Sequence, residues 1–95
     1  MKFLEKYNFN KEDIKEFLCI TPKKLIDLIE SEKDLVEVNL KYFTSLGINT
    51  YREIFINYPD MFLMDASDFK NVFDKYDKDS LIAKLNKNFK IVEYL

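Results

Sequence analysis

The stretch SLGINTYREIFINYP, residues 45–59, contains the one glycine of the chain and one of its two prolines. Gly47 is suited to end a helix, because glycine readily adopts the left-handed conformation that follows a helix C-terminus. Asn49 or Thr50 is suited to begin the next helix, and Pro59 to stop it. The stretch therefore predicts two helices that are joined by a tight turn.

Apolar residues recur at helical spacing on both sides of this turn, and no stretch alternates apolar and polar residues over the length of a strand. The longest predicted helix precedes Gly47. We expect its core face to be Leu35, Val38, Tyr42 and Leu46, flanked by Val36, Leu40 and Phe43. The pattern predicts an all-α fold of seven or eight short helices with tight links.

Residues that favour helix N-caps stand before the apolar segments. Asn10 is followed by Asp13 at the third helical position, which is the arrangement of a capping box. The other predicted caps are Thr21 before Pro22, Ser31 with Asp34 three residues on, Asp65, and Asp77 or Asp79.

The composition predicts a single folded domain over residues 1–95, since 47% of the residues are hydrophobic and 34% are charged. The one cysteine, Cys19, excludes an intrachain disulfide and favours a reducing, cytoplasmic compartment; we expect it to be a small core residue. The opening MKFLEKYNF predicts neither a signal peptide nor a transit peptide. No apolar run is long enough to cross a bilayer, so we expect no membrane partner.

The residue types that carry most catalytic and metal chemistry are absent or scarce. The chain has no histidine and one glycine, which excludes the GxxxxGK[ST] and GxGxxG phosphate-binding loops. The segment DFKNVFDKYDKDSLI resembles the start of an EF-hand. Counted from Asp77, however, its fifth and sixth positions are Leu81 and Ile82, where a calcium loop needs an oxygen ligand and a glycine. We expect no enzyme activity, no cofactor, no metal and no small-molecule substrate.

Three stretches of the chain align with one another: KFLEKYNFN from Lys2, KYFTSLGIN from Lys41 and NVFDKYDKD from Asn71. Each has large apolar residues at the second, third and sixth places, a helix-stopping residue at the seventh, and Asn or Asp at the ninth. A short amphipathic helix follows each one and breaks near Pro22, Pro59 or Phe89. We interpret this as an internal repeat with units 2–40, 41–70 and 71–95. The alternative is that any series of short amphipathic helices produces the same similarity.

The residues also resemble a known family. The segments FNKEDIKEFLCITPKKLI (Phe9–Ile26), KDLVEVNLKYFTSLGI (Lys33–Ile48) and REIFINYPDMFLM (Arg52–Met64) look like consecutive pieces of repeats from the mitochondrial transcription termination factor (mTERF) family. The resemblance covers most of the chain. It implies an α-solenoid of helical triplets, each with two α-helices and one short 3₁₀-type piece, that binds nucleic acid along a basic concave face. The chain departs from the family in its short length, its overall acidic charge and the lack of an evident organelle-targeting segment. In addition, Phe89 stands where the third proline belongs, and the second unit is shortened between Pro59 and Tyr76.

Two classes of partner remain open, and the net charge of −2 places protein ahead of nucleic acid. A protein partner or a second copy would contact the acidic segment or the C-terminal apolar residues. These candidates are Asp27, Glu30, Glu32, Asp34, Glu37, Ile91, Val92, Tyr94 and Leu95. Because the third unit stops at FKIVEYL, we expect part of its apolar face to be uncovered; the alternative is that the last helix folds back on Leu81 and Leu85.

The second class is a nucleic-acid-binding module, which would be either mTERF-like or a helix-hairpin-helix. The segment LGINTYREI (Leu46–Ile54) resembles the second half of a helix-hairpin-helix. The basic candidates of this module are Lys23, Lys24, Arg52, Lys84, Lys87 and Lys90, with Tyr51 or Tyr58 able to stack on bases. A single arginine limits bidentate contacts to bases and phosphates.

Overall fold

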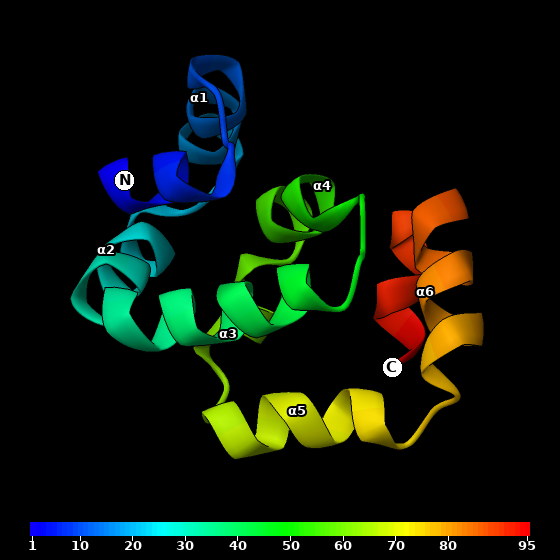
Figure 1. Cartoon of the computed structure of the whole chain (residues 1–95). Helices are drawn as coiled ribbons and strands as arrows, with labels where there is room; N and C mark the ends of the chain where they lie inside the picture. Colours follow the sequence, from blue (N-terminus) through cyan, green and yellow to red (C-terminus); the bar gives the residue numbers. More distant parts are fainter.

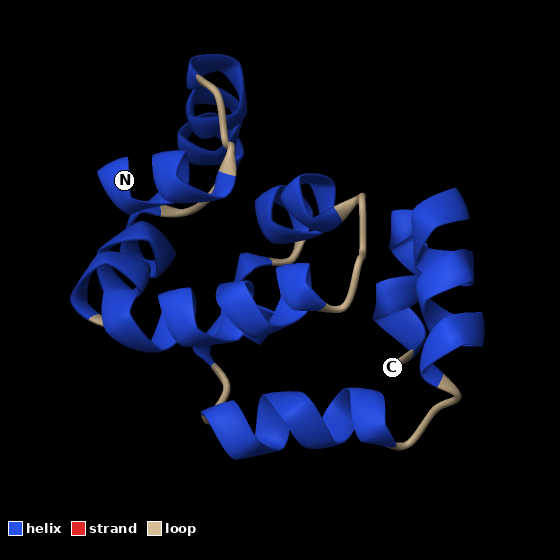
Figure 2. Ribbon diagram, viewed as in Figure 1, coloured by secondary structure: helices blue, strands red, loops and turns tan.

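A computed structural model describes all residues, 1–95, and the all-α prediction is confirmed: every regular element is helical (Figure 2). The α-helices are α1 (Lys11–Ile20), α2 (Lys23–Ser31), α3 (Lys33–Ser45), α4 (Tyr51–Asn57), α5 (Ala66–Asp74) and α6 (Lys78–Lys87). Three 3₁₀ helices accompany them, η1 (Lys2–Tyr7), η2 (Pro59–Leu63) and η3 (Phe89–Tyr94).

The helices are arranged around α3, which runs through the middle of the molecule (Figure 1). Helices α1 and α2 lie at one end, and α6 with η3 lies at the other. Helix α3 contacts η2 and α5, and α4 contacts α1, η2 and η3. Along the chain, α1–α2–α3 and α4–η2–α5 are two successive groups of three helices, each with a break after its first helix. The pair α6–η3 matches the first two helices of such a group. The internal repeat itself stays a prediction.

Several predicted helix ends are confirmed. Helix α3 ends at Ser45 and is followed by Gly47 with φ 86°. The capping box at α1 is present: Asn10 Oδ1 accepts from the Asp13 amide at 2.8 Å, and Asp13 Oδ2 accepts from the Asn10 amide at 3.0 Å. Asp65 caps α5 by accepting from the amide of Ser67 at 2.9 Å.

Two predicted caps, Thr21 and Ser31, are wrong. Helix α2 begins at Lys23, so Pro22 takes the cap position, and the Pro22 carbonyl accepts the first hydrogen bonds of the helix. The Ser31 hydroxyl donates back to the Leu28 carbonyl at 2.9 Å. Ser31 therefore satisfies an end carbonyl of α2 and does not open α3, which begins one residue after Glu32.

Gly47 gives a direct test of the turn that follows α3. An added Cβ would meet no atom within 4 Å, so replacing Gly47 with alanine changes only the backbone preference. We expect Gly47→Ala to lower the free energy of unfolding by about 1–2 kcal/mol, the cost of a left-handed conformation for a residue with a Cβ. Gly47→Asn should lose less, because asparagine tolerates this region, as Asn8 does here at φ 66°. Chemical denaturation measures both values, and an equal loss for the two variants would contradict this explanation.

The core contains a continuous row of aromatic rings, which we call the aromatic spine: Phe9, Phe17, Phe55, Phe62, Phe43, Phe69 and Phe73. Phe62 is its junction. Its ring centroid lies 5.2 Å from that of Phe55, 5.4 Å from that of Phe43 and 5.3 Å from that of Phe69. The spine therefore connects α1, α3, α4, η2 and α5 through one set of ring contacts.

The predicted inner face of α3 is wrong by one position. Its buried residues are Val36, Asn39, Leu40 and Phe43, whereas Val38 is 54% exposed. The buried face includes the polar residue Asn39, whereas the predicted face of Leu35, Val38, Tyr42 and Leu46 has no such polar residue. The sequence pattern therefore favours the wrong face. The Asn39 amide nitrogen donates to the carbonyls of Phe62 at 2.9 Å and Met64 at 2.8 Å, so it clamps α3 to the end of η2.

The placement of Cys19 in the core is also wrong, because Cys19 is exposed. Helix α1 lies at the edge of the molecule and packs on α4 along one face, on which Phe17 is the fully buried residue. Residues 18–20 turn away from that face, and Leu18 is exposed as well.

Candidate functional site

The C-terminal groove is an apolar depression of about 260 Å³ between η2, α5 and η3. Six of its seven lining residues are hydrophobic, and two of these are methionines. The lining residues are Tyr58, Asp60, Met61, Met64, Val72, Val92 and Leu95.

Local sequence signals build the walls of this groove. Pro59 stops α4 and occupies the first turn of η2, where its missing N–H costs nothing. Within η2, Phe62 is fully buried in the spine, and Met61 is left partly exposed along the groove. On the opposite wall, Asn88 caps η3 by accepting from the Lys90 amide at 3.1 Å, and Val92 is buried.

A tyrosine–glutamate hydrogen bond ties the two walls together beside the groove. The Tyr58 hydroxyl donates to Glu93 Oε1, and the rings of Tyr58 and Phe89 lie 6.5 Å apart, centroid to centroid. The hydrogen bond to Glu93, followed by desolvation and the Glu93 charge, raises the pKa of Tyr58 to about 12. The contact therefore favours the neutral phenol, which donates this bond, and holds η3 against the end of α4.

The Tyr58–Glu93 contact predicts a pH dependence. The folded-state pKa of about 12 lies above the ordinary value of 10.0, so the contribution of this contact to stability is complete below pH 10 and is lost as the pH rises through 12. In Glu93→Gln we expect the Tyr58 pKa to fall towards 10, because the charged acceptor is gone. Phenolate absorbance of wild type, Glu93→Gln and Tyr58→Phe measures this. Because the pKa of Tyr7 is also raised, one late-titrating phenol should remain in Tyr58→Phe, and a phenolate titration identical to that of wild type would contradict the assignment.

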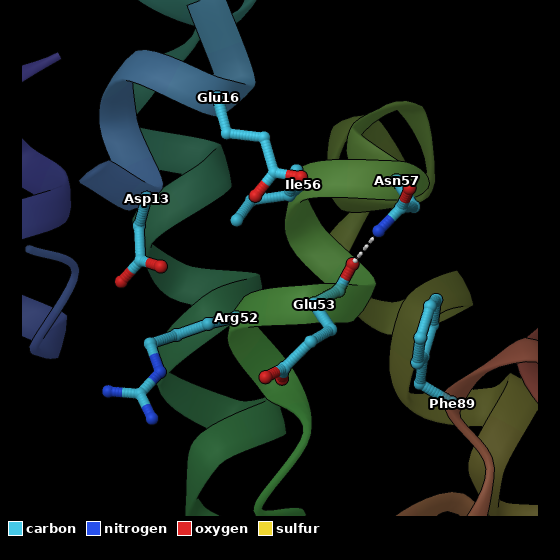
Figure 3. A pocket seen from close by; sticks show the side chains of 7 residues that line it. All are labelled: Asp13, Glu16, Arg52, Glu53, Ile56, Asn57 and Phe89. Carbon is cyan, nitrogen blue, oxygen red and sulfur yellow. Dashed lines mark hydrogen bonds between the residues drawn. The ribbon is translucent and has the colours of Figure 1, made fainter. Parts of the chain in front are cut away.

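A second groove, about 370 Å³ in volume, lies between α1 and α4, with Phe89 at its edge. Figure 3 shows that Asp13 and Glu16 come from α1, whereas Arg52 and Glu53 come from α4. Most of its polar groups already have structural partners. Asp13 belongs to the capping box, Arg52 Nη1 donates to the Asn8 carbonyl at 3.2 Å, and Asn57 Nδ2 donates to the Glu53 carbonyl at 2.8 Å. No group of three or more His, Cys, Asp or Glu side chains is arranged to hold a metal ion.

Part of the predicted acidic surface contributes to internal contacts. Glu30 Oε1 accepts from the N-terminal amine at 2.7 Å. Glu37 Oε1 lies 3.4 Å from Lys6 Nζ and accepts from the Tyr7 hydroxyl at 3.3 Å. Burial, and then the charge and hydrogen bond of Glu37, raises the pKa of Tyr7. These two glutamates therefore fasten the N-terminal segment to α2 and α3.

The other acidic candidates lie on the outside of the same helices. Asp27 forms an exposed pair with Lys23 at 3.2 Å, one turn apart on α2. Glu32 and Asp34 are exposed at the turn between α2 and α3. Such exposed charges contribute little to stability.

The basic candidates are divided between the two ends of the molecule. Lys23 and Lys24 begin α2, whereas Lys84 and Lys87 on α6 and Lys90 on η3 belong to the opposite end (Figure 1). Arg52 on α4 is held against the Tyr51 ring, 5.6 Å from the ring centroid. Lys84, Lys87 and Lys90 therefore lie on two consecutive elements, and none of these three forms an ion pair within the chain.

The C-terminal candidates have different environments. Val92 is 7% exposed and belongs to the core, so it is not part of an uncovered apolar face. The last helix, η3, folds back against α6, which was the alternative expectation, and against α4. Ile91 and Leu95 are partly buried against the core, whereas Tyr94 is 82% exposed. Sequence reasoning missed the η2 and α5 side of the groove, for which Met61 and Met64 on either side of the core residue Phe62 were the available signal.

Comparison with protein-family models, curated proteins and solved structures found no match. None of the helices is both long enough and apolar enough to span a membrane.

Proposed function

We propose that the chain is a non-catalytic protein-binding module that contacts its partner through the C-terminal groove, as a regulator or inhibitor would. The observation that carries this proposal is the apolar lining of the groove, with Met61 and Met64 on one wall and Leu95 on the other. Methionine side chains are flexible and polarizable, so they adapt to an incoming apolar side chain. The exposed ring of Tyr94 beside the groove adds a residue type that is enriched at protein interfaces.

A volume of about 260 Å³ suits one or two apolar side chains and is too small for a large ligand. The partner would therefore insert a short apolar anchor, and the rest of the contact would spread over the surrounding surface. The exposed acidic residues, Asp27 on α2 and Glu32 and Asp34 at the turn between α2 and α3, lie at the other end of the molecule from α6 and η3. They would favour a partner that carries basic residues and extends beyond the groove.

The test compares two surface variants. Met61→Gln/Met64→Gln makes the groove polar at nearly constant side-chain length, and Lys84→Gln/Lys87→Gln/Lys90→Gln is a control that leaves the groove intact. The tagged chain is exposed to lysate of the source organism with and without nuclease. The proposal expects a protein that survives nuclease, is retained by the lysine variant and is lost with the methionine variant. A partner lost with nuclease and with the lysine variant would reject it.

The alternative is nucleic-acid binding, and the position of Lys84, Lys87 and Lys90 on adjacent elements favours it together with the mTERF resemblance. Three unpaired lysines can neutralise only a few phosphates. Binding that depends on releasing counterions from phosphates is weak when few phosphates are contacted, and it weakens further as the salt concentration rises.

We therefore expect no tight binding of duplex DNA at physiological salt. The net charge of −2 opposes binding away from the lysines, so we expect dissociation constants weaker than about 10⁻⁶ M near 0.15 M salt. A titration of fluorescent duplex at several salt concentrations measures this, with the triple lysine variant as the control. Sub-micromolar binding that the lysine variant abolishes would favour the alternative function.

A further inference from the structure

One apolar stripe runs through α6 and η3 although the two helices are separate. Leu81, Leu85, Phe89 and Val92 follow one another at steps of four, four and three residues, which is the spacing of a single continuous helix. Leu81, Leu85 and Val92 are buried and Phe89 is partly buried. The apolar spacing alone therefore does not mark the position at which the structure turns, although the repeat alignment predicts a break near Phe89.

The break after α6 also differs from the two breaks that correspond to it in the predicted repeat. Pro22 stands between α1 and α2, and Pro59 begins η2 directly after α4. Proline lacks the N–H that a continuing helix needs. At the third break the corresponding residue is Phe89, and no glycine or proline occurs from Lys78 to the last residue. The first two breaks are therefore enforced covalently, and the third is not.

Asn88 is the residue that holds the third break. Its own amide donates to the Lys84 carbonyl at 2.9 Å, as it would within a helix, but its dihedral angles are extended at φ −150° and ψ 102°. Its side chain accepts from the Lys90 amide at 3.1 Å and so caps η3. A change of dihedral angles at this one residue would let α6 continue through residues 89–94.

We infer that Asn88 is a hinge and that α6 extends through it in a minor form of the chain, which pairs with a second copy by exchanging η3. The inference goes beyond the proposed function: it concerns the same C-terminal segment, but the second copy replaces η3 and leaves the groove open to another partner. Exchange of one element between identical chains is a low-cost route to a dimer, because each chain receives from the other the same segment that it gives up.

The surroundings of η3 explain why the occupant is a second copy. When η3 leaves, the Tyr58 hydroxyl is without Glu93, the Tyr58 ring is without Phe89, and the core is without Val92. The η3 segment of a second copy supplies the same three side chains in the same places. It also rebuilds the wall of the groove that Val92 and Leu95 form. The exchange is reciprocal, so it gives a closed pair with the same surface on both chains.

Variants at the hinge test this. Asn88→Ala removes the cap and improves helix propensity, so it favours the extended form. Phe89→Pro blocks extension, and Phe89→Ala is its matched control, since both remove the ring and only proline forbids the helix. Phe89→Pro should not strain the backbone of the folded monomer at residue 88, because a residue before proline prefers extended dihedral angles and Asn88 already has them. Circular dichroism of each variant checks that it folds.

In sedimentation equilibrium we expect Asn88→Ala to raise the dimer association constant on the order of tenfold or more, because one cap is lost at each of two hinges. The dimer should persist in Asn88→Ala/Phe89→Ala and disappear in Asn88→Ala/Phe89→Pro. An association constant for Asn88→Ala no higher than that of wild type would overturn the inference. A dimer unaffected by Phe89→Pro would overturn it as well.

A cross-linking experiment separates exchange from side-by-side pairing. In an Asn88→Ala, Cys19→Ser background, cysteines replace Met61 and Leu95, which face the groove from its two walls. A short bis-maleimide reagent should join them within one chain in the monomer and between chains in the isolated dimer. Cross-links only within chains in the dimer would reject exchange. A failed exchange leaves the lysate experiment with the methionine variant unaffected, so the failures of the two proposals are distinguishable.

Discussion

Replacing Phe62 with alanine is expected to lower the free energy of unfolding by about 3–5 kcal/mol, the range for deleting a fully buried phenylalanine ring. The Phe62 side chain is completely buried, and its ring contacts Phe55, Phe43 and Phe69 on three different helices. Removing it leaves a cavity at the junction of the aromatic spine.

Equilibrium denaturation by urea measures this loss, with Tyr94→Ala as the matched control. Tyr94 is 82% exposed, so its removal should change the free energy of unfolding by no more than about 0.5 kcal/mol. If Phe62→Ala lowered the free energy of unfolding by less than about 1 kcal/mol, Phe62 would not be the junction of the core.

The second large effect is expected at Asn39, which is 1% exposed. Asn39→Ala removes the donor to two carbonyls, Phe62 O and Met64 O, and leaves a small cavity in α3. Leaving a buried acceptor unpaired costs about 1–3 kcal/mol, so we expect a total loss of about 2–4 kcal/mol. Asn39→Asp should lose more at neutral pH, because it places a carboxylate against two carbonyl oxygens.

The pH dependence of the Asn39→Asp variant separates the clamp from simple packing. Burial and the facing carbonyls favour the protonated acid, so the loss should shrink as the pH falls through the pKa of the new carboxyl group. Asn71→Ala is the control, since Asn71 is exposed on α5 and should cost about 0.5 kcal/mol or less. Equal losses for Asn39→Ala and Asn71→Ala in thermal or urea denaturation would show that the clamp contributes nothing.

Helix ends were predictable where the signal is local. Gly47, Asn10, Asp65 and Pro59 act through their own dihedral angles or through bonds to residues two or three positions away, so the sequence around each contains the whole cause. Ser31 shows the limit even of a local signal. Its hydroxyl could serve either neighbouring helix, and it bonds backwards to α2.

The inner face of α3 and the candidate site were not predictable, because they depend on partners that are distant in sequence. Asn39 looks like an outer residue until the carbonyls of Phe62 and Met64 are placed beside it. Glu30 and Glu37 look like free surface charges, yet they pair with the N-terminal amine and with Lys6. The groove likewise requires η2, α5 and η3 to meet, and no single segment indicates that.

The position of Phe62 in the chain has a consequence for the speed of folding. Its ring partners lie on α3, α4 and α5, the elements that immediately precede and follow η2, so these contacts close short loops at small entropic cost. We therefore expect α3 through α5 to form the folding nucleus, with α1 and η3 docking afterwards. Substitutions in the spine should then slow refolding, whereas substitutions in η3 should mainly accelerate unfolding.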